Sequence, residues 1–162
     1  MIVDLKQITC VDILVIADSA ESYAIRSILE SFGIQTRLHY IGNIRHLISL
    51  LKEKGYLYKT LVFSCHGEKE GLLIPELSTE LEQTMPFHKR LNALNLRAIL
   101  NLNNQLVIST GCCLGKEEYG QVFLDKGAQA YIGAVDYIEA STMVMFVVNF
   151  LYFYFVRRLP LK

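Results

Sequence analysis

Two segments of this chain end in residues whose types could do chemistry. The run Gln105–Gly115, QLVISTGCCLG, is an apolar stretch that stops at the adjacent Cys112 and Cys113. A second apolar run, Thr60–Ser64, leads directly into Cys65–His66. A thiolate is a nucleophile, and an imidazole can lower the pKa of a nearby thiol and transfer protons. The simplest joint interpretation of the two segments is therefore a Cys–His pair.

Both runs have the unbroken apolar character of strands that are covered on both faces. In an open α/β sheet, side chains at the carboxyl ends of neighbouring strands meet at one edge, so we expect His66 and Cys112 to face each other there. The wider pattern alternates strands, predicted at 11–17, 35–40, 61–64, 106–108 and 130–135, with helices, predicted at 18–33, 43–55, 91–100, 120–126 and 141–156. Residues 68–90 are predicted to form a long loop with a hairpin. Alternation of this kind predicts a three-layer α/β/α sandwich with a mostly parallel sheet of five or six strands.

Length and composition limit what the pair can mean. With 162 residues the chain is expected to form one domain, and 16 Lys and Arg balance 16 Asp and Glu, so no nucleic-acid partner is expected. The amino terminus lacks the pattern of a secretory signal, and four cysteines in an unexported chain favour the cytoplasm. No GxGxxG or Walker-type loop is present, so we expect no cofactor.

Four segments occur in an order that resembles the caspase-like cysteine peptidases, the group of caspases, legumains, gingipains, separases and CHAT domains. They are Phe63–Gly67 (FSCHG), Gly71–Ile74 (GLLI), Leu106–Gly115 (LVISTGCCLG) and Lys126–Gly133 (KGAQAYIG). In that family one strand ends in His-Gly, the next core strand ends in the catalytic cysteine, and a Gly-Ala segment leads into the following strand. The resemblance implies a caspase-like fold over residues 1–162, in a minimal or truncated form.

The resemblance implies a cysteine endopeptidase that hydrolyses peptide bonds in a peptide or protein substrate, with His66 as the catalytic histidine. Cys-x-x-Gly spacing, as in legumain-like and CHAT sequences, makes Cys112 the nucleophile, whereas the Cys-x-Gly spacing of caspases would select Cys113. The N–H groups of Gly67 and Cys112 would then stabilise the oxyanion. In such peptidases strand ends also build the substrate pocket, so Asp18 and Asp136 are candidates for binding a cationic side chain.

Several alternatives stay open from the residues themselves. Cys65, His66, Cys112 and Cys113 could hold zinc, although adjacent ligands are not the usual zinc spacing, and we expect no metal. Asp18 could cap the following helix and Asp136 could be solvated. The scaffold could also serve as a non-catalytic binding or signalling module. A receiver domain is disfavoured, because Ser64 stands where a phospho-acceptor aspartate would be expected.

The last predicted helix, 141–156, is apolar almost all round. It is shorter than the roughly 20 residues of a membrane span, so it is expected to bury most of its circumference. Packing of this helix on a second copy of the chain or on a partner protein would achieve that. The sequence thus predicts a homo-oligomer or a complex with a partner protein through residues 141–156 and makes membrane insertion the minor alternative.

Overall fold

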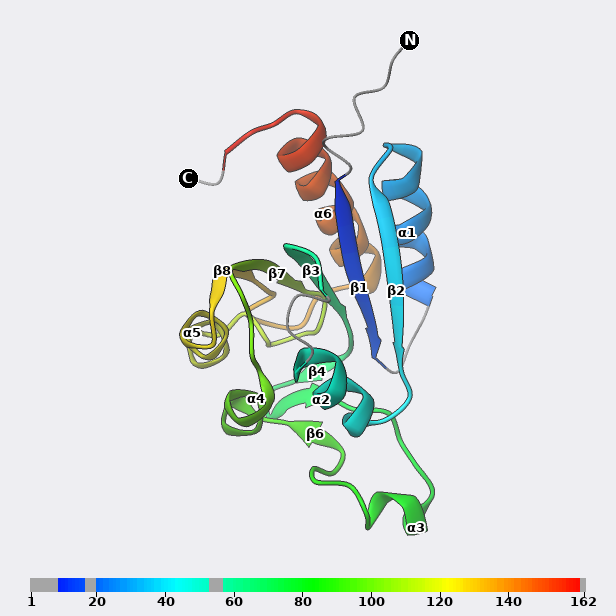
Figure 1. Cartoon of the computed structure of the whole chain (residues 1–162), viewed down its shortest axis with the longest axis vertical. Coiled ribbons are helices and arrows are strands. Elements are labelled where there is room, and N and C mark those ends of the chain that lie inside the picture. The colour runs from blue at the N-terminus through cyan, green and yellow to red at the C-terminus, as the bar shows by residue number, and fades with distance from the viewer. Residues whose placement is uncertain (1–8, 17–19, 53–56, 161–162) are drawn as a thin grey trace.

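A computed structural model describes residues 9–16, 20–52 and 57–160 (Figure 1). Its main sheet has five parallel strands in the order β2-β1-β3-β7-β8. The strands are β1 (Cys10–Ile16), β2 (Gln35–Ile41), β3 (Thr60–Ser64), β7 (Gln105–Ser109) and β8 (Ala128–Ile132). Every residue of β3 and β7 is buried, as expected for central strands of a parallel sheet.

Helices cover both faces of this sheet (Figure 1). On one face, α1 (Ala20–Ser31) and α6 (Ala140–Leu151) pack over the side chains of Ile13, Val62 and Ile108. On the other face, α2 (Ile44–Lys52), α4 (Ala93–Ile99) and α5 (Glu117–Asp125) pack over Leu14, Phe63 and Val107, among others. The predicted three-layer α/β/α architecture is confirmed.

Local sequence signals explain where several helices begin and end. The side-chain oxygen of Asn43 accepts the backbone N–H groups of Arg45 and His46, which caps α2 as the sequence predicts. Gly33 has a φ of 78°, and this left-handed conformation ends α1 at low cost. The predicted cap at Asp18 and the predicted end of the second helix near Gly55 lie outside the described residues.

A small antiparallel sheet lies between β3 and α4. It consists of β4 (Gly67–Glu68), β5 (Gly71–Leu73) and β6 (Arg90–Leu91), and a short helix, α3 (Thr79–Glu82), follows β5. The predicted hairpin is therefore present. The helix predicted at 91–100 begins later, because Asn92 forms a reciprocal capping box with Asn95 and leaves Leu91 in a strand.

The end of the chain differs from the sequence prediction in two ways. Strand β8 occupies 128–132 rather than 130–135, directly after the left-handed Gly127. The last helix continues as a π-helical segment, η2 (Tyr152–Val156), but α6 buries only Met143, Val147, Val148 and Leu151. The expectation that this helix buries most of its circumference is wrong. None of the helices formed by the described residues is both long enough and apolar enough to cross a membrane.

Candidate functional site

The segments after β3 and β7 meet at the carboxyl edge of the sheet. These two strands are neighbours and run parallel, with Thr60 opposite Leu106 and Phe63 opposite Ser109. The residues that follow them, Cys65–Gly67 and Gly111–Gly115, therefore start from the same edge. This is the placement that the sequence predicts for the two cysteine-bearing segments.

Cys65 is part of a buried polar network. Its backbone N–H donates to the Thr110 hydroxyl at 3.1 Å, and its thiol lies 3.6 Å from the Ser109 hydroxyl. Burial raises the pKa of the Cys65 thiol to about 12, since the hydrogen bonds from Ser109 and the Gly111 N–H offset the desolvation only in part. Cys65 is thus a protonated structural thiol at neutral pH.

The adjacent cysteines have different surroundings. Cys113 is completely buried and has a φ of 62°, so the turn directs its side chain into the core. The thiol of Cys112 is half-buried and lies between the backbone groups of Ile138, donating to the carbonyl at 3.6 Å and accepting the N–H at 3.5 Å. Of the two, only Cys112 offers a thiol with access to solvent.

Gly67, which follows His66, packs against the turn that carries Cys112. His66 is exposed, whereas Gly67 is buried and pairs with Leu72 in the small sheet. A Cβ added at Gly67 would lie 2.3 Å from the carbonyl oxygen of Cys112, so only glycine allows this approach. Close packing of two backbone segments is a structural reason for the His-Gly sequence.

A pocket of about 530 Å³ lies beside His66. It is lined by His66 together with residues of the small sheet and the loop that follows it, namely Glu68, Leu73, Ile74, Pro75, Glu76, Leu77, Glu82, Lys89 and Arg90. Arg90 forms ion pairs with Glu68 at 3.2 Å and with Glu70 at 3.1 Å. Cys112 does not line this pocket. Sequence analysis missed these charged residues, because the loop of residues 68–90 has no periodicity that would show which side chains converge.

The structure describes one of the two predicted substrate-binding carboxylates, Asp136. Asp18 lies outside the described residues. Asp136 is exposed, and its carboxylate accepts the N–H of Tyr137 at 2.8 Å within a turn. Its backbone carbonyl accepts the N–H of Cys113 at 3.2 Å. In this structure Asp136 shapes the turn beside Cys113, and its side chain faces solvent.

The described residues contain no group of three or more His, Cys, Asp and Glu side chains placed to hold a metal ion. The zinc alternative therefore has no support within this part of the chain.

At the end of β3, Ser64 is buried and accepts a hydrogen bond of 2.7 Å from the Ser22 hydroxyl. The carboxyl end of this central strand thus carries a hydroxyl that is already bonded inside the protein.

Comparison with known proteins places the fold. No family model and no curated protein matches the chain. The Mn(2+)-bound form of the response regulator Rcp1 matches with a TM-score of 0.50 at 12% identity, over 94% of this chain and 98% of that one. A CheY-like response regulator receiver domain protein from Methanospirillum hungatei JF-1 matches with a TM-score of 0.43 at 13% identity, over 90% of this chain and 94% of that one.

The match to Rcp1 corrects the inference drawn from sequence. It shows a response-regulator type of fold, so the assignment to the caspase-like cysteine peptidases is wrong, and with it the cysteine endopeptidase activity and the peptide substrate that rested on that assignment. The hydrogen-bonded thiol of Cys112 and the protonated thiol of Cys65 are consistent with this correction. The prediction that Ser64 argues against a receiver domain is wrong as far as the fold is concerned. The fold is similar to that of Rcp1 although Ser64 stands at the end of β3.

Proposed function

We propose that this chain is a non-catalytic protein-interaction module of the signalling type, which docks a protein with an uncharged apolar surface. The docking surface is the outer face of α6 and η2, here called the α6 face. Its members Met145, Phe146, Phe153 and Val156 are between 38% and 56% exposed. This exposed apolar face is the observation that carries the proposal, because a surface helix normally turns charged residues outward.

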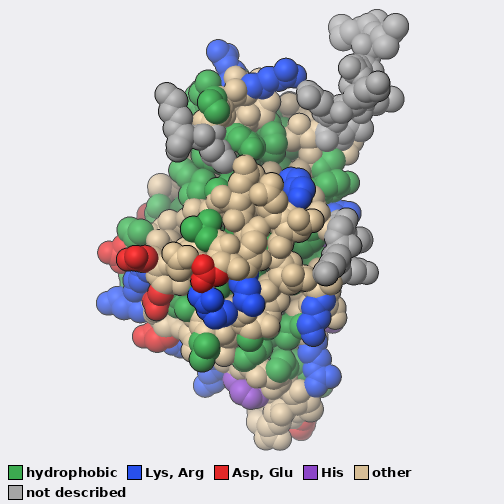
Figure 2. Space-filling model, turned by 60° about the vertical axis from the view of Figure 1, so that its left-hand side comes forward, with side chains coloured by type: hydrophobic (Ala, Val, Ile, Leu, Met, Phe, Trp, Pro, Cys, Tyr) green, Lys and Arg blue, Asp and Glu red, His purple; other side chains and the backbone are tan. Residues whose placement is uncertain are grey.

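The arrangement of the surface supports this assignment. In Figure 2, hydrophobic side chains gather on the upper part of the molecule, where η2 and the end of α6 lie in Figure 1, and the visible acidic side chains lie lower. The fold is that of a response regulator, Rcp1, and the low identity limits this likeness to architecture. The interaction role therefore comes from the α6 face, and the fold similarity is in agreement with it.

The carboxyl edge has a supporting role in this proposal. In this proposal His66, Gly67 and Cys112 shape the edge of the sheet and carry no reaction, and His66 also lines the neighbouring pocket. The thiol of Cys112 is satisfied by the backbone of Ile138, and Ser64 by Ser22. The described cysteines are free thiols, so we place the module in a reducing compartment, the cytoplasm.

The proposal is tested by separating chemistry from docking. Wild type and Cys112→Ala are incubated with a fluorogenic peptide library and with an electrophilic peptide probe, and we expect no turnover and no difference in library signal between them. Turnover that disappears in Cys112→Ala would overturn the proposal.

The docking part is tested with a hydrophobic-surface dye. Phe153→Ser should lower dye binding, whereas the same change at Leu124, a 45% exposed residue of α5, gives the effect of losing an isolated apolar side chain. Equal losses in the two variants would mean that the α6 face is no continuous docking surface.

A further inference from the structure

The α6 face carries no charge along its whole length. Helix α6 and η2 together run from Ala140 to Val156, and the sequence has no charged residue between these limits. Met145, Asn149, Phe153 and Val156 recur at three- or four-residue spacing, which places them on one side of the helix, opposite the buried Val147. The Asn149 amide already donates to the Met145 carbonyl at 2.7 Å. The face therefore offers a partner little beyond apolar contact.

Charged residues lie at both ends of this face, with opposite signs. Asp136 and Glu139 precede the helix, and Arg157 and Arg158 follow it. Glu139 and Arg157 are exposed. A parallel pair of such helices would place like charges together at each end. An antiparallel pair would place Arg157 beside Glu139 of the partner subunit, and the reverse pair would form at the other end.

We propose that the α6 face pairs with the α6 face of a second copy of this chain, with the two helices antiparallel about a twofold axis. This inference rests on the proposed function and names the partner of that docking surface. A twofold interface uses the same patch on both copies, so an uncharged face flanked by an acidic and a basic end is complementary to itself. The axis would pass near Asn149, midway between Glu139 and Arg157.

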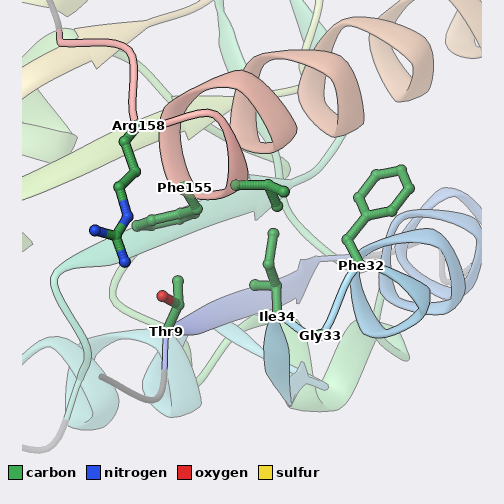
Figure 3. Close-up of a pocket in the computed structure, with 7 residues that line it drawn as sticks. Thr9, Phe32, Gly33, Ile34, Phe155 and Arg158 are labelled. Atoms are coloured by element: carbon green, nitrogen blue, oxygen red, sulfur yellow. The ribbon is translucent and has the colours of Figure 1, made fainter. Parts of the chain in front are cut away.

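The shape of the ends agrees with this arrangement. A hollow of about 420 Å³ lies at the end of η2, lined by Phe155, Val156 and Arg158 together with Thr9, Phe32, Gly33 and Ile34. Figure 3 shows Arg158 reaching along the hollow toward Thr9, while Phe155 and Ile34 form its inner wall. At the other end of the helix, Val135 and Tyr137 are 67% and 61% exposed. Antiparallel pairing would bring these protruding side chains to the end of the partner that carries the hollow.

The available area is close to what a stable dimer needs. Seven apolar side chains on or beside the face are each between 38% and 67% exposed, namely Val135, Tyr137, Met145, Phe146, Phe153, Val156 and Leu159. At roughly 100 Å² each they provide about 700 Å² per copy, against about 800 Å² per partner in a standard interface. Backbone and rim atoms would supply the remainder. A second copy can therefore cover the face without any additional protein.

The test uses the full chain and measures its dimer dissociation constant by sedimentation equilibrium. Phe153→Ser should raise the dissociation constant at least about tenfold, since it removes a central apolar anchor. Leu124→Ser is the matched control, because Leu124 is 45% exposed on α5, away from the face, and its change should leave the constant within about twofold. Circular dichroism confirms that each variant is folded.

Charge reversal tests the antiparallel orientation. Arg157→Glu and Glu139→Arg should each weaken the dimer by several-fold, and the double variant should restore it, because opposite charges again meet at both ends. A double variant no tighter than the single ones would overturn the antiparallel pairing. So would a dimer insensitive to Phe153→Ser.

A wild-type chain that stays monomeric at every concentration would overturn self-pairing. Sedimentation with phosphatidylcholine–phosphatidylglycerol vesicles then tests whether a lipid surface covers the α6 face. A monomer that binds vesicles through Phe153 would make the face a lipid-binding surface. These failures are distinct from failure of the proposed function. Turnover dependent on Cys112 would reject the non-catalytic module whatever the oligomeric state, whereas a monomer without turnover would reject only the second copy as partner.

Discussion

At the scale of single residues, the buried carboxylate of Asp12 makes several hydrogen bonds away from the carboxyl edge of the sheet. Asp12 of β1 is completely buried, and its carboxylate accepts Arg37 at 2.6 and 3.1 Å, His39 at 2.7 Å and the N–H of Tyr58 at 2.5 Å. Burial by itself would raise the pKa of Asp12, but the hydrogen bonds from His39, Arg37 and Tyr58 outweigh it and lower the pKa below its ordinary value of 3.8. The carboxylate is therefore stabilised in its charged form.

Replacing Asp12 by Asn should lower the free energy of unfolding at pH 7 by about 2–4 kcal/mol, because Arg37 and His39 lose their buried partner. A group with a depressed folded pKa stabilises the protein above its unfolded pKa, and this contribution is lost as the pH falls through the folded pKa. The difference between wild type and Asp12→Asn should therefore shrink below about pH 4. Urea denaturation across pH measures it, with Glu80→Gln at an exposed position as the control. A constant difference at all pH values would contradict this account.

The thiols should react in the order of their exposure. Cys10 and Cys112 are half-buried, while Cys65 and Cys113 are buried, and burial raises the pKa of Cys65 to about 12. In the native protein, Ellman's reagent at pH 8 should therefore titrate Cys10 and Cys112 first, and the other two only in denaturant. Comparison of Cys112→Ala with Cys65→Ala assigns the phases. Loss of a fast phase in Cys65→Ala would show that the carboxyl edge opens more readily than this packing allows.

At the scale of elements, the turn after β7 and the segment after β8 hold each other in place at the carboxyl edge. The turn after β7 donates the Gly115 N–H to the Ala134 carbonyl at 2.7 Å. The backbone at Gly115 also packs directly on Gly133, which follows β8. Contacts of this kind need residues without side chains, and they fix the turn that carries Cys112 and Cys113. Close packing thus accounts for the two glycines of the Gly-Cys-Cys-Leu-Gly sequence.

Two glycines near this edge should respond oppositely to alanine. A Cβ at Gly115 would lie 2.0 Å from the carbonyl oxygen of Gly133, so Gly115→Ala should cost at least about 2 kcal/mol through backbone displacement. Gly120 lies within α5, and its Cβ would meet nothing closer than Tyr131 at 3.8 Å. Gly120→Ala should therefore stabilise the protein by about 0.5–1 kcal/mol. Thermal unfolding followed by circular dichroism checks both signs, and a stabilised Gly115→Ala would refute the packing argument.

At the scale of the whole molecule, stability is concentrated at the centre of the sheet. Strands β3 and β7 are buried throughout and lie between other strands, whereas β2 and β8 form the two edges of the sheet and are partly exposed. The ion cluster around Asp12 joins β1 to the edge strand β2. The helices on both faces of the sheet therefore pack on the same buried central strands, β3 and β7.

Hydrogen exchange should follow this arrangement. The amides of β3 and β7 should exchange only through global unfolding, and those of β8 should exchange faster through local opening at the free edge. Mass spectrometry of peptides from the labelled protein measures the difference, with the buried strand β1 as the internal reference. Equal protection in β8 and β7 would mean that the outer side of β8 is covered in solution, by a partner or a second copy.

Periodicity alone was sufficient to predict the layered fold. The apolar runs of Leu61–Ser64 and Leu106–Ile108 are too short for buried helices and therefore favour buried strands, and the intervening helical spacings require crossovers that make the sheet parallel. Caps such as Asn43 and the stop at Gly33 depend on neighbouring residues only, so they too were predictable. Local chemistry thus determined the elements and their order.

Only the tertiary structure decided what the cysteines and the last helix do. The sequence could not show that the Cys112 thiol would bond to the backbone of Ile138, 26 positions away, because that contact depends on how the turn packs. Nor could the sequence of α6 show which side would stay exposed, since large apolar residues occur on every side of the helix. The spacing of residues along a chain specifies helices and strands, whereas solvent access and thiol reactivity depend on distant segments that pack against them.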